Sequence, residues 1–338
     1  MKKLSFLNKI IYFINVVVAV LLLLSFVLPF LPPKTFSILA VVNLGVSFLI
    51  ILNVLFFIYW LIGLKKQFIL SFFVLCIGYF SFGSLYKFSS SKKIENPQNF
   101  KVMNYNVRLF DLYDWIPESN TEKKIVDFIK NEAPEILSIQ EYHPHKNIDL
   151  SFFKYKYVKL SGKKLQSGQA IYSQFPIVNS GSIEFPNTAN NAIFADIVKG
   201  KDTIRIYNMH LQSLGLKTNK ENFGHKTSEK LIGRLKEGFK QQAEQTEDFL
   251  KHQKNWKGKT IIAGDFNNTS YSWVYNEISK DKRDAFIEAG KGFGKTFDYW
   301  FPMRIDFILS DETATINSFK NYNVNYSDHF PIQARINW

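Results

Sequence analysis

Three long apolar stretches open the chain, and a pattern of shorter apolar runs follows them. The stretches cover Ile10–Leu31, Phe36–Leu64 and Phe68–Leu85. Crossing the hydrocarbon core of a bilayer takes about 20 predominantly apolar residues. The first two stretches are therefore long enough and the third is just long enough. The pattern predicts an anchor with three transmembrane helices within residues 1–88.

The first stretch has an alternative interpretation as a cleaved signal peptide. No small-x-small cleavage site follows it, and two further apolar stretches do, so a membrane helix is the favoured interpretation. Two polar residues, Asn43 and Asn53, interrupt the second stretch. They could form hydrogen bonds between helices or simply be tolerated there.

The lysines beside these stretches bear on the orientation of the anchor, because cytoplasmic loops carry an excess of Lys and Arg. One side carries Lys2, Lys3, Lys9, Lys65 and Lys66, and the other carries Lys34, Lys87, Lys92 and Lys93. The last three begin a large domain that would be translocated regardless of its charge. We therefore expect a multi-pass protein with a cytoplasmic N-terminus and a C-terminal domain outside the cytoplasm.

Residues 100–338 are numerous enough for one large single-core domain, and the Ser/Lys-rich residues 89–99 are a predicted linker. Strands are predicted at Lys101–Val107, Ile136–Gln140, Gln169–Ser173, Ala192–Val198, Thr203–Met209, Thr260–Ala263, Arg304–Leu309 and Pro331–Ile336. Helical patterns cover Glu122–Asn131, capped by Asn120 or Thr121, and the amphipathic Thr227–Gln253. Strands occur both between helices and in consecutive runs, which favours stacked sheets with helices outside them.

Charge and cysteine content add little to this picture. The chain carries a formal net charge of +13, but residues 1–87 contain seven Lys and no Arg, Asp or Glu. The remaining 35 basic and 29 acidic residues leave +6, which suits a protein that meets phosphates but does not identify nucleic acid. The only cysteine, Cys76, lies in the third apolar stretch. The C-terminal domain therefore has no disulfide or thiol chemistry.

Polar residues typical of metal and phosphate chemistry lie at the ends of the predicted strands. The segments are Met103–Arg108, Ser138–Glu141, Tyr207–Leu211, Gly264–Asn267, Arg304–Leu309 and Ser327–Pro331. Gly264-Asp265-Phe266-Asn267 places a carboxylate and a carboxamide side by side at the edge of a sheet. Such a pair can activate a water and contact a phosphate or a hard cation. Asp and Asn are also ordinary turn residues, so the meaning of this turn depends on its partners.

Together, these segments resemble the endonuclease/exonuclease/phosphatase superfamily, which includes deoxyribonuclease I, AP endonucleases, neutral sphingomyelinases and inositol polyphosphate 5-phosphatases. The matching residues are Asn106, Glu141, His210, Asp265, Asn267, Asp306, Asp328 and His329. Gly168–Ile177 resembles a hairpin of the family, in which a basic residue commonly stands where this chain has Gln174. The resemblance covers residues 100–338 and implies an α+β fold, a four-layer α/β sandwich of two packed mixed β-sheets flanked by helices. It also implies Mg²⁺-dependent hydrolysis of a phosphate ester, with Mn²⁺ or Ca²⁺ as possible substitutes.

The first part of the expected site concerns the metal and the water. Glu141 is the expected metal carboxylate, because Mg²⁺ prefers oxygen ligands and usually takes only one or two from protein. Asn106 and Asp328 would complete the metal's surroundings directly or through water. Asp265 would orient and activate the attacking water, and Asn267 would place it and contact the phosphate.

The second part concerns donors to the phosphate. His329 would donate to a non-bridging oxygen, held in orientation by Asp306. His210 would be a second donor to the phosphate or the leaving group, with a strand-end histidine bonded to a loop as the alternative. A histidine there is similar to the deoxyribonuclease, sphingomyelinase and phosphatase branches, since AP endonucleases place a tyrosine in that role. Arg108 could contact the substrate phosphate or be an ordinary surface arginine.

The expected function is a membrane-anchored, divalent-metal-dependent phosphoesterase that hydrolyses phosphodiester bonds of a nucleic acid or a phospholipid head group. A nuclease would need a basic groove, with candidates Lys163, Lys164, Lys217, Lys220, His225 and Lys226. A lipid phosphodiesterase would need an apolar entrance, with candidates Trp115, Phe152, Phe153, Trp273, Tyr299, Trp300 and Phe301. The alternatives are a phosphomonoesterase and a catalytically inactive membrane-tethered binding or signalling domain. No obligate protein partner is predicted.

Overall fold

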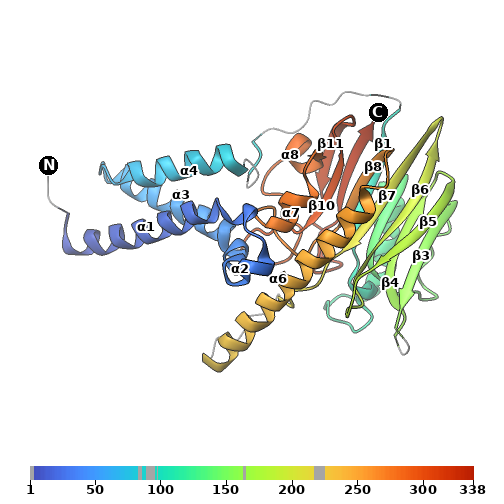
Figure 1. The fold of residues 1–338 in the computed structure, drawn as a ribbon, viewed down its shortest axis with the longest axis horizontal. Coiled ribbons are helices and arrows are strands. Elements are labelled where there is room, and N and C mark those ends of the chain that lie inside the picture. Colours follow the sequence, from blue (N-terminus) through green and yellow to red (C-terminus); the bar gives the residue numbers. More distant parts are fainter. Residues whose placement is uncertain (1–3, 83–85, 89–95, 97, 163–164, 217–224) are drawn as a thin grey trace.

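The computed structural model describes residues 4–82, 86–88, 96, 98–162, 165–216 and 225–338. An N-terminal layer of helices lies at one end of the molecule, and two six-stranded sheets lie at the other (Figure 1). The C-terminal end of the chain lies with the sheets, far from the start of the first helix.

The first sheet has the strand order β11-β12-β1-β2-β4-β3. Its strands are β1 Phe100–Asn106, β2 Ile136–Tyr142, β3 Tyr155–Ser161, β4 Ser167–Ser173, β11 Thr315–Asn321 and β12 Ile332–Asn337. β1 and β2 are parallel, with Asn106 opposite Gln140, and the other pairs are antiparallel. Because parallel strands end at the same edge, Asn106 and Glu141 emerge side by side.

The second sheet has the strand order β5-β6-β7-β8-β10-β9. Its strands are β5 Ile177–Glu184, β6 Asn191–Lys199, β7 Asp202–His210, β8 Lys259–Asp265, β9 Lys282–Asp284 and β10 Asp306–Asp311. β7 and β8 are parallel, with His210 opposite Asp265. β10 is antiparallel to β8, with Asp306 also opposite Asp265. Three predicted site residues therefore share one edge of this sheet.

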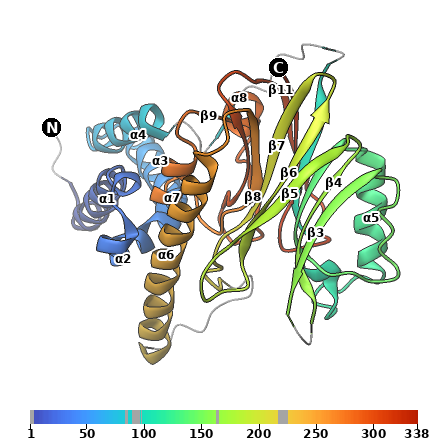
Figure 2. The same cartoon turned by 45° about the vertical axis from the view of Figure 1, so that its right-hand side comes forward.

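The core lies between the two sheets, and helices cover their outer faces. Inward-facing residues of both sheets, such as Val102, Ile206 and Ile261, form the central cluster. Helix α5 (Thr121–Glu132) packs on the first sheet, while α6 (His225–Gln253) and α7 (Trp273–Ile278) pack on the second (Figure 2). The expected α+β arrangement of two mixed sheets flanked by helices is confirmed.

All eight predicted strands are present, but four strands and two short helices were not predicted. These elements are β3, β5, β9, β11, α7 and α8 (Ala285–Ala289). The predicted helix at residues 122–131 is α5, and its side-chain cap is absent because Asn120 makes no capping hydrogen bond. The missed strands β3 and β5 are largely half-exposed, so they lack a continuous apolar run.

The N-terminal layer differs from the prediction of three transmembrane helices. It consists of α1 Phe6–Ser25, η1 Leu28–Phe30, α2 Pro33–Ala40, η2 Val41–Gly45, α3 Val46–Ile62 and α4 Phe68–Phe82. Among the described residues, two segments, Phe6–Phe30 and Val42–Ile62, are long and apolar enough to cross a membrane. α4 has 15 described residues, and residues 83–85 after it lie outside the described part of the chain, so the third span stays a prediction.

The second apolar stretch is also not one helix. Phe36 has non-helical backbone angles (φ −120°, ψ 45°), and the 3₁₀ segment η2 separates α2 from α3. The predicted linker at 89–99 lies largely outside the described residues, because only 96, 98 and 99 of it are described. Its boundaries stay a prediction.

One polar network joins the helices of this layer. The Nδ2 atom of Asn15 donates to the Ser71 hydroxyl at 2.8 Å, and its Oδ1 accepts from the indole of Trp60 at 3.0 Å. These residues lie on α1, α4 and α3. Asn53 instead donates to the Leu49 carbonyl of its own helix at 2.9 Å. The Tyr59 hydroxyl on α3 also donates to Asn8 Oδ1 on α1 at 2.8 Å. Asn8 and Asn15 are therefore interhelical amides that the sequence pattern did not single out.

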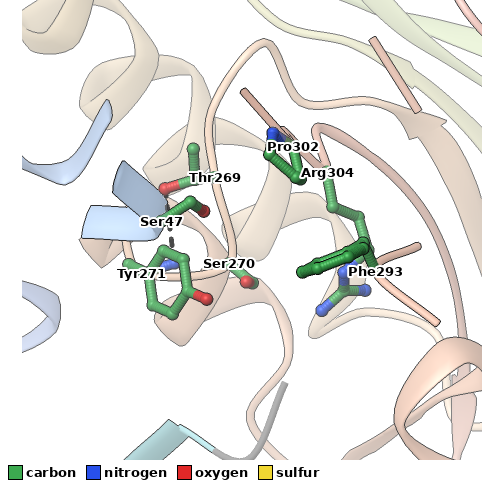
Figure 3. Close-up of a pocket in the computed structure, with 7 residues that line it drawn as sticks. All are labelled: Ser47, Thr269, Ser270, Tyr271, Phe293, Pro302 and Arg304. Atoms are coloured by element: carbon green, nitrogen blue, oxygen red, sulfur yellow. Dashed lines mark hydrogen bonds between the residues drawn. The ribbon is translucent and has the colours of Figure 1, made fainter. Parts of the chain in front are cut away.

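The N-terminal layer packs directly against the sandwich, where α2 lies beside α6 (Figures 1 and 2). Lys34 and Glu247 form an ion pair at 2.6 Å, and the Thr269 hydroxyl donates to the Asn43 carbonyl at 3.2 Å. Figure 3 shows a small cavity at this junction. It is lined by Ser47, Thr269, Ser270, Tyr271, Phe293, Pro302 and Arg304. The helices and the sheets thus share a continuous interface.

Candidate active site

The predicted site residues gather around one pocket of about 80 Å³ at the end of the sandwich. Its charged side consists of Glu141, Asp265, Asn267, Asp328 and His329. Its apolar side consists of Leu214, Leu216, Phe297, Met303 and Ile305. The pocket therefore places acid, amide and imidazole groups opposite a wall of hydrocarbon.

Local backbone features aim the charged side into the pocket. A Cβ atom on Gly264 would lie 2.2 Å from the Met209 carbonyl oxygen, so glycine allows β8 to approach β7 closely just before Asp265. Asn267 adopts a left-handed conformation (φ 50°), which Asn tolerates better than most residues. Glu141 is also left-handed (φ 51°) and follows a shift of strand register. Such irregularities re-aim side chains at strand ends.

Asp265 is the centre of the site and is almost fully buried. Its Oδ1 accepts from the backbone N–H of Asn267 at 2.7 Å, and its Oδ2 accepts from the amides of Asn106 and Asn267 at 3.1 and 3.2 Å. Burial, assisted by the nearby Asp306, raises the pKa of Asp265 to about 7, although His329 and these hydrogen bonds oppose the shift. The carboxylate is thus oriented by three donors and titrates near neutral pH.

His329 lies between two buried carboxylates. Its Nδ1 is 2.9 Å from Asp306 Oδ2, and its Nε2 is 3.7 Å from Asp265 Oδ2. Burial alone lowers the pKa of His329, but Asp306 and Asp265 outweigh it and raise that pKa well above the usual value. The pairing of Asp306 with His329 that the sequence suggested is present. It holds a positive ring against the central carboxylate.

His210 presents a neutral ring to the same region. Its Nε2 lies 3.9 Å from both Glu141 Oε1 and Asp265 Oδ2, and it is buried without a hydrogen-bond partner. Burial, together with the charge of His329, lowers the pKa of His210 to about 3. This ring nitrogen faces carboxylates rather than a loop, so it has unused hydrogen-bonding capacity inside the site.

Glu141 stands at the mouth of the pocket, with 36% of its side chain exposed. Its Oε1 accepts from Asn106 Nδ2 at 3.3 Å. Burial and the charge of Asp328 raise the pKa of Glu141 above its ordinary value. Asp328 in turn lies 3.3 Å from the guanidinium of Arg108. Two acids therefore meet here, and Arg108 contacts only one of them.

The donor set fits a hard cation at Glu141 better than at the buried acids. Asp265, Asp306 and His329 offer ligand atoms within 4.8 Å of one another, but the positive charge of His329 already occupies the space between the two carboxylates. Glu141 has carboxylate oxygens and a raised pKa, and a divalent cation would stabilise its deprotonated form. Asn106 turns its amide nitrogen toward the acids, while its amide oxygen accepts from the backbone N–H of Arg108 at 3.1 Å.

Arg108 is held by more contacts than a free surface residue. Its guanidinium carbon lies 4.5 Å from the centre of the Trp115 ring, besides pairing with Asp328. It begins η3 (Arg108–Asp111), whose four residues all have positive φ, between 45° and 61°. Left-handed conformations are costly for residues other than glycine, so the surroundings must hold this turn beside the site.

A network of buried amides beneath the site was not predicted. Gln140 Nε2 donates to Asn104 Oδ1 at 2.8 Å and to Asn208 Oδ1 at 2.6 Å. Asn208 Nδ2 donates to the Ile139 carbonyl at 2.8 Å, and Asn104 Nδ2 lies 3.4 Å from Asp306 Oδ1. Asn104 and Asn208 each sit between two apolar residues of a strand, where a single polar residue carries little pattern, so the sequence did not indicate this network.

The other candidates are dispersed. Among the aromatic residues, Phe152 and Phe153 pack near α5 and Trp273 packs on the second sheet, away from the pocket. Residues 299–301 adjoin its apolar side. Lys163, Lys164, Lys217, Lys220 and the side chains of His225 and Lys226 lie outside the part of the chain that the structure describes. The basic groove expected of a nuclease is therefore untested.

Comparison with known families agrees with this geometry. Residues 103–329 match the Endonuclease/Exonuclease/phosphatase family. The chain belongs to this family. Residues 8–85 match a second family, described as a domain of unknown function (DUF8431). No curated protein matches the chain.

Solved structures similar to this family member support the fold. The endonuclease/exonuclease/phosphatase from Beutenbergia cavernae DSM 12333 is 17% identical, with a TM-score of 0.53 over 71% of this chain and 72% of its own. A humanized D. rerio TDP2 is 16% identical, with a TM-score of 0.53 over 71% and 100%. The human Nocturnin catalytic domain with bound sulfate anion is 18% identical, with a TM-score of 0.54 over 75% and 96%.

Proposed function

We propose that the chain is a membrane-anchored, divalent-metal-dependent phosphodiesterase that cleaves its substrate by attack of water. The observation that carries this proposal is the environment of Asp265, which three donors orient and whose pKa burial raises to about 7. Membership of the family supports the class of reaction. Two long apolar helices support the anchor. Every predicted site position retains the residue type that this chemistry needs, which argues against the inactive binding domain.

A divalent cation, Mg²⁺ with Mn²⁺ or Ca²⁺ as substitutes, fits the site through Glu141, with Asp328 and Asn106 near it. When bound, such a cation neutralises charge that develops on the phosphate oxygens. Asn106 would serve as a ligand only by turning its amide oxygen toward Glu141, because its nitrogen faces the acids. The tetrahedral sulfate bound by nocturnin has the shape of the phosphate that we propose for this pocket.

Asp265 takes the proton of the attacking water. As the water oxygen forms its bond to phosphorus, one water proton moves to the Asp265 carboxylate, and the amide of Asn267 donates to hold the reacting oxygens in place. A general base works best when its pKa lies near the working pH, and burial brings the pKa of Asp265 to about 7. The free enzyme therefore has a base suited to neutral conditions.

The two histidines act on the phosphate. His329, charged and held by Asp306 at 2.9 Å, donates an N–H to a non-bridging oxygen and stabilises the negative charge of the transition state. His210, which is neutral, directs its ring nitrogen toward the leaving oxygen. The bond between phosphorus and that oxygen breaks, and the oxygen takes up a proton from solvent water as it leaves. Arg108 contacts the phosphate from the side of Asp328.

The arrangement of the helices supports the proposed topology. α1 starts at the end of the N-terminal layer farthest from the sheets, and the sandwich lies at the other end (Figure 1). With α4 as the third crossing that we propose, and with the lysine distribution, this arrangement favours a cytoplasmic N-terminus and a site outside the cytoplasm. A reporter fused to the C-terminus tests the orientation.

Hydrolysis of bis(p-nitrophenyl) phosphate by the full chain with Mg²⁺ tests the reaction. Asp265→Asn should lower the rate at least about 10³-fold, because it removes the base and leaves the shape unchanged. The matched control is Asp281→Asn, at an exposed position whose positive φ suits asparagine, and it should keep the wild-type rate. Equal activity of wild type and Asp265→Asn would refute the mechanism.

A further inference from the structure

We infer that the pocket takes its phosphodiester from the bilayer that holds α1 and α3, so that its substrate is a membrane phospholipid. The surface that meets the lipid consists of Phe48 and residues 299–301, called here the aromatic lip. This inference rests on the proposed function and adds to it the source of the substrate.

The apolar side of the pocket is continuous with the N-terminal layer. Phe297, Met303 and Ile305 form one buried cluster with Phe301, and Leu44 and Phe48 pack against it. Leu44 also packs, together with Leu216, on the cluster that contains Leu214. The wall of the pocket and the start of the membrane helix are therefore one packed unit.

This continuity fixes the depth of the pocket. Leu44 and Phe48 lie in the first two turns of the apolar segment Val42–Ile62, and a helix rises about 1.5 Å per residue. The hydrocarbon core is about 30 Å thick and the head-group layer adds roughly 5 to 8 Å on each side. A pocket packed on the first turns of a spanning helix therefore lies at the depth of lipid head groups, where phosphodiesters are concentrated.

The aromatic lip has the composition of an interfacial surface. Trp300 is 69% exposed, and its ring lies 5.0 Å from that of Phe48. Exposed Phe293, whose ring lies 4.9 Å from that of Tyr86, is close to Ser47 at the same junction. Tryptophan and tyrosine favour the boundary between lipid and water. An exposed tryptophan beside the first turns of an apolar helix is stabilised by a bilayer surface.

The composition of the pocket favours a lipid over a nucleic acid. Five of the described residues that line it are apolar, namely Leu214, Leu216, Phe297, Met303 and Ile305. This apolar side suits the glycerol and acyl portion of a lipid whose phosphate reaches the charged side, whereas a nucleic-acid backbone calls for a row of cations.

The experiment uses the full chain in nanodiscs of phosphatidylcholine with phosphatidylglycerol, and it compares three substrates. They are bis(p-nitrophenyl) phosphate in solution, the phospholipids of the nanodisc itself, and DNA. Wild type should hydrolyse the soluble diester and the phospholipids. Trp300→Ala should lower phospholipid hydrolysis about tenfold, a loss of about 1.4 kcal/mol, and keep the soluble rate within about twofold.

The control is Tyr155→Ala, which removes a ring that is 38% exposed from β3, at the end of the molecule opposite α1 (Figure 1). It should leave both rates unchanged. Cleavage of DNA with no cleavage of phospholipid would overturn the inference while leaving the proposed phosphodiesterase intact. Failure to hydrolyse even the soluble diester would refute the proposed function instead.

A second measurement does not depend on activity. Nanodiscs whose lipids carry bromine near the head group should quench the fluorescence of Trp300, seen as the difference between wild type and Trp300→Phe. Equal quenching in the two proteins would place Trp300 away from the bilayer and overturn the inference. Unchanged thermal unfolding of Trp300→Ala and Trp300→Phe shows that both variants fold.

Discussion

The charged and apolar sides of the pocket are built in different ways. The residues of the charged side lie at strand ends of both sheets. They orient one another by short contacts, such as that between Asp306 and His329 at 2.9 Å. The apolar side comes from connecting segments and is backed by Leu44 and Phe48 of the N-terminal layer. The reacting groups are thus positioned by the sandwich alone, whereas the apolar side of the pocket also depends on residues of the N-terminal layer, which are far away in the chain.

This difference separates two kinds of substitution. Changes on the charged side disturb buried charges, which are expensive to leave unpaired. Changes on the apolar side remove hydrocarbon contacts, which cost less and leave the reacting groups in place. The first kind should abolish hydrolysis, and the second should mainly alter stability and access.

The largest combined effect on stability and activity is expected from His329→Ala. The substitution leaves Asp265 and Asp306 facing each other without the positive ring that lies between them. Breaking such a buried pair costs about 3–5 kcal/mol, and loss of the donor should lower hydrolysis more than about 10²-fold. Chemical unfolding and the rate on bis(p-nitrophenyl) phosphate measure the two effects.

His329→Gln serves as a second variant in case the alanine variant does not fold. Glutamine retains a donor but carries no charge, so its stability should fall between those of wild type and His329→Ala. The control is His145→Ala, at an exposed loop position, which should change neither property. A stable and active His329→Ala variant would show that the buried charges are not coupled in this way.

The second effect concerns metal binding and pH. Burial and the charge of Asp328 raise the pKa of Glu141 above its ordinary value, and a cation binds only the deprotonated form of this carboxylate. Stabilisation by Mg²⁺ should therefore be weaker at pH 5 than at pH 8, where it should reach about 2.7 kcal/mol at 100 times the dissociation constant. The shift of the unfolding temperature with Mg²⁺ against chelator measures it.

Glu141→Gln should abolish this shift at every pH, because it removes the carboxylate that we propose binds the Mg²⁺ ion. Glu288→Gln, at a half-exposed residue on α8 near Arg283, should keep it. An equal Mg²⁺ shift at pH 5 and pH 8 would contradict the assignment of the cation to Glu141.

The charged side could be predicted from sequence because its residues follow strands that the apolar pattern reveals. Asn106, His210 and Asp265 lie at or just beyond the ends of predicted strands and end β1, β7 and β8 in the structure, and strands that neighbour each other in a sheet bring their ends together. The spacing alone did not reveal the amides beneath them. Gln140 and Asn208 sit inside apolar runs, where a single polar residue carries little pattern.

The apolar side could not be predicted, because its contacts join segments far apart in the sequence. Nothing local indicates that Leu44 packs on Leu216 and Met303. The same limit applied to the second apolar stretch. Uniform hydrophobicity concealed the break at Phe36, where the backbone leaves the helical region. A pattern of apolar residues predicts the length and burial of an element, but it does not predict where a helix bends or which residues pack against it.

The third prediction tests the apolar side. Leu44→Ala should lower the free energy of unfolding by about 2 kcal/mol, at the low end of the range for buried leucines because the residue is only half-buried. Hydrolysis of the soluble diester should stay within about twofold, since no reacting group moves. Leu55→Ala, exposed on the same segment, is the control and should change neither. Loss of the soluble activity in Leu44→Ala would show that the two sides are not separable.

The smallest effect is expected within the N-terminal layer itself. Asn15→Ala removes the hydrogen bonds to Ser71 and from Trp60 that join α1, α3 and α4. Hydrogen bonds between membrane helices contribute about 0.6 kcal/mol on average, so thermal unfolding in detergent should shift by a few degrees and hydrolysis should not change. Asn15→Asp would place a charge among the helices and should destabilise much more. A loss of activity in Asn15→Ala without a shift in unfolding would mean that this remote network adjusts the site through the packed junction, and the division between the two regions would then fail.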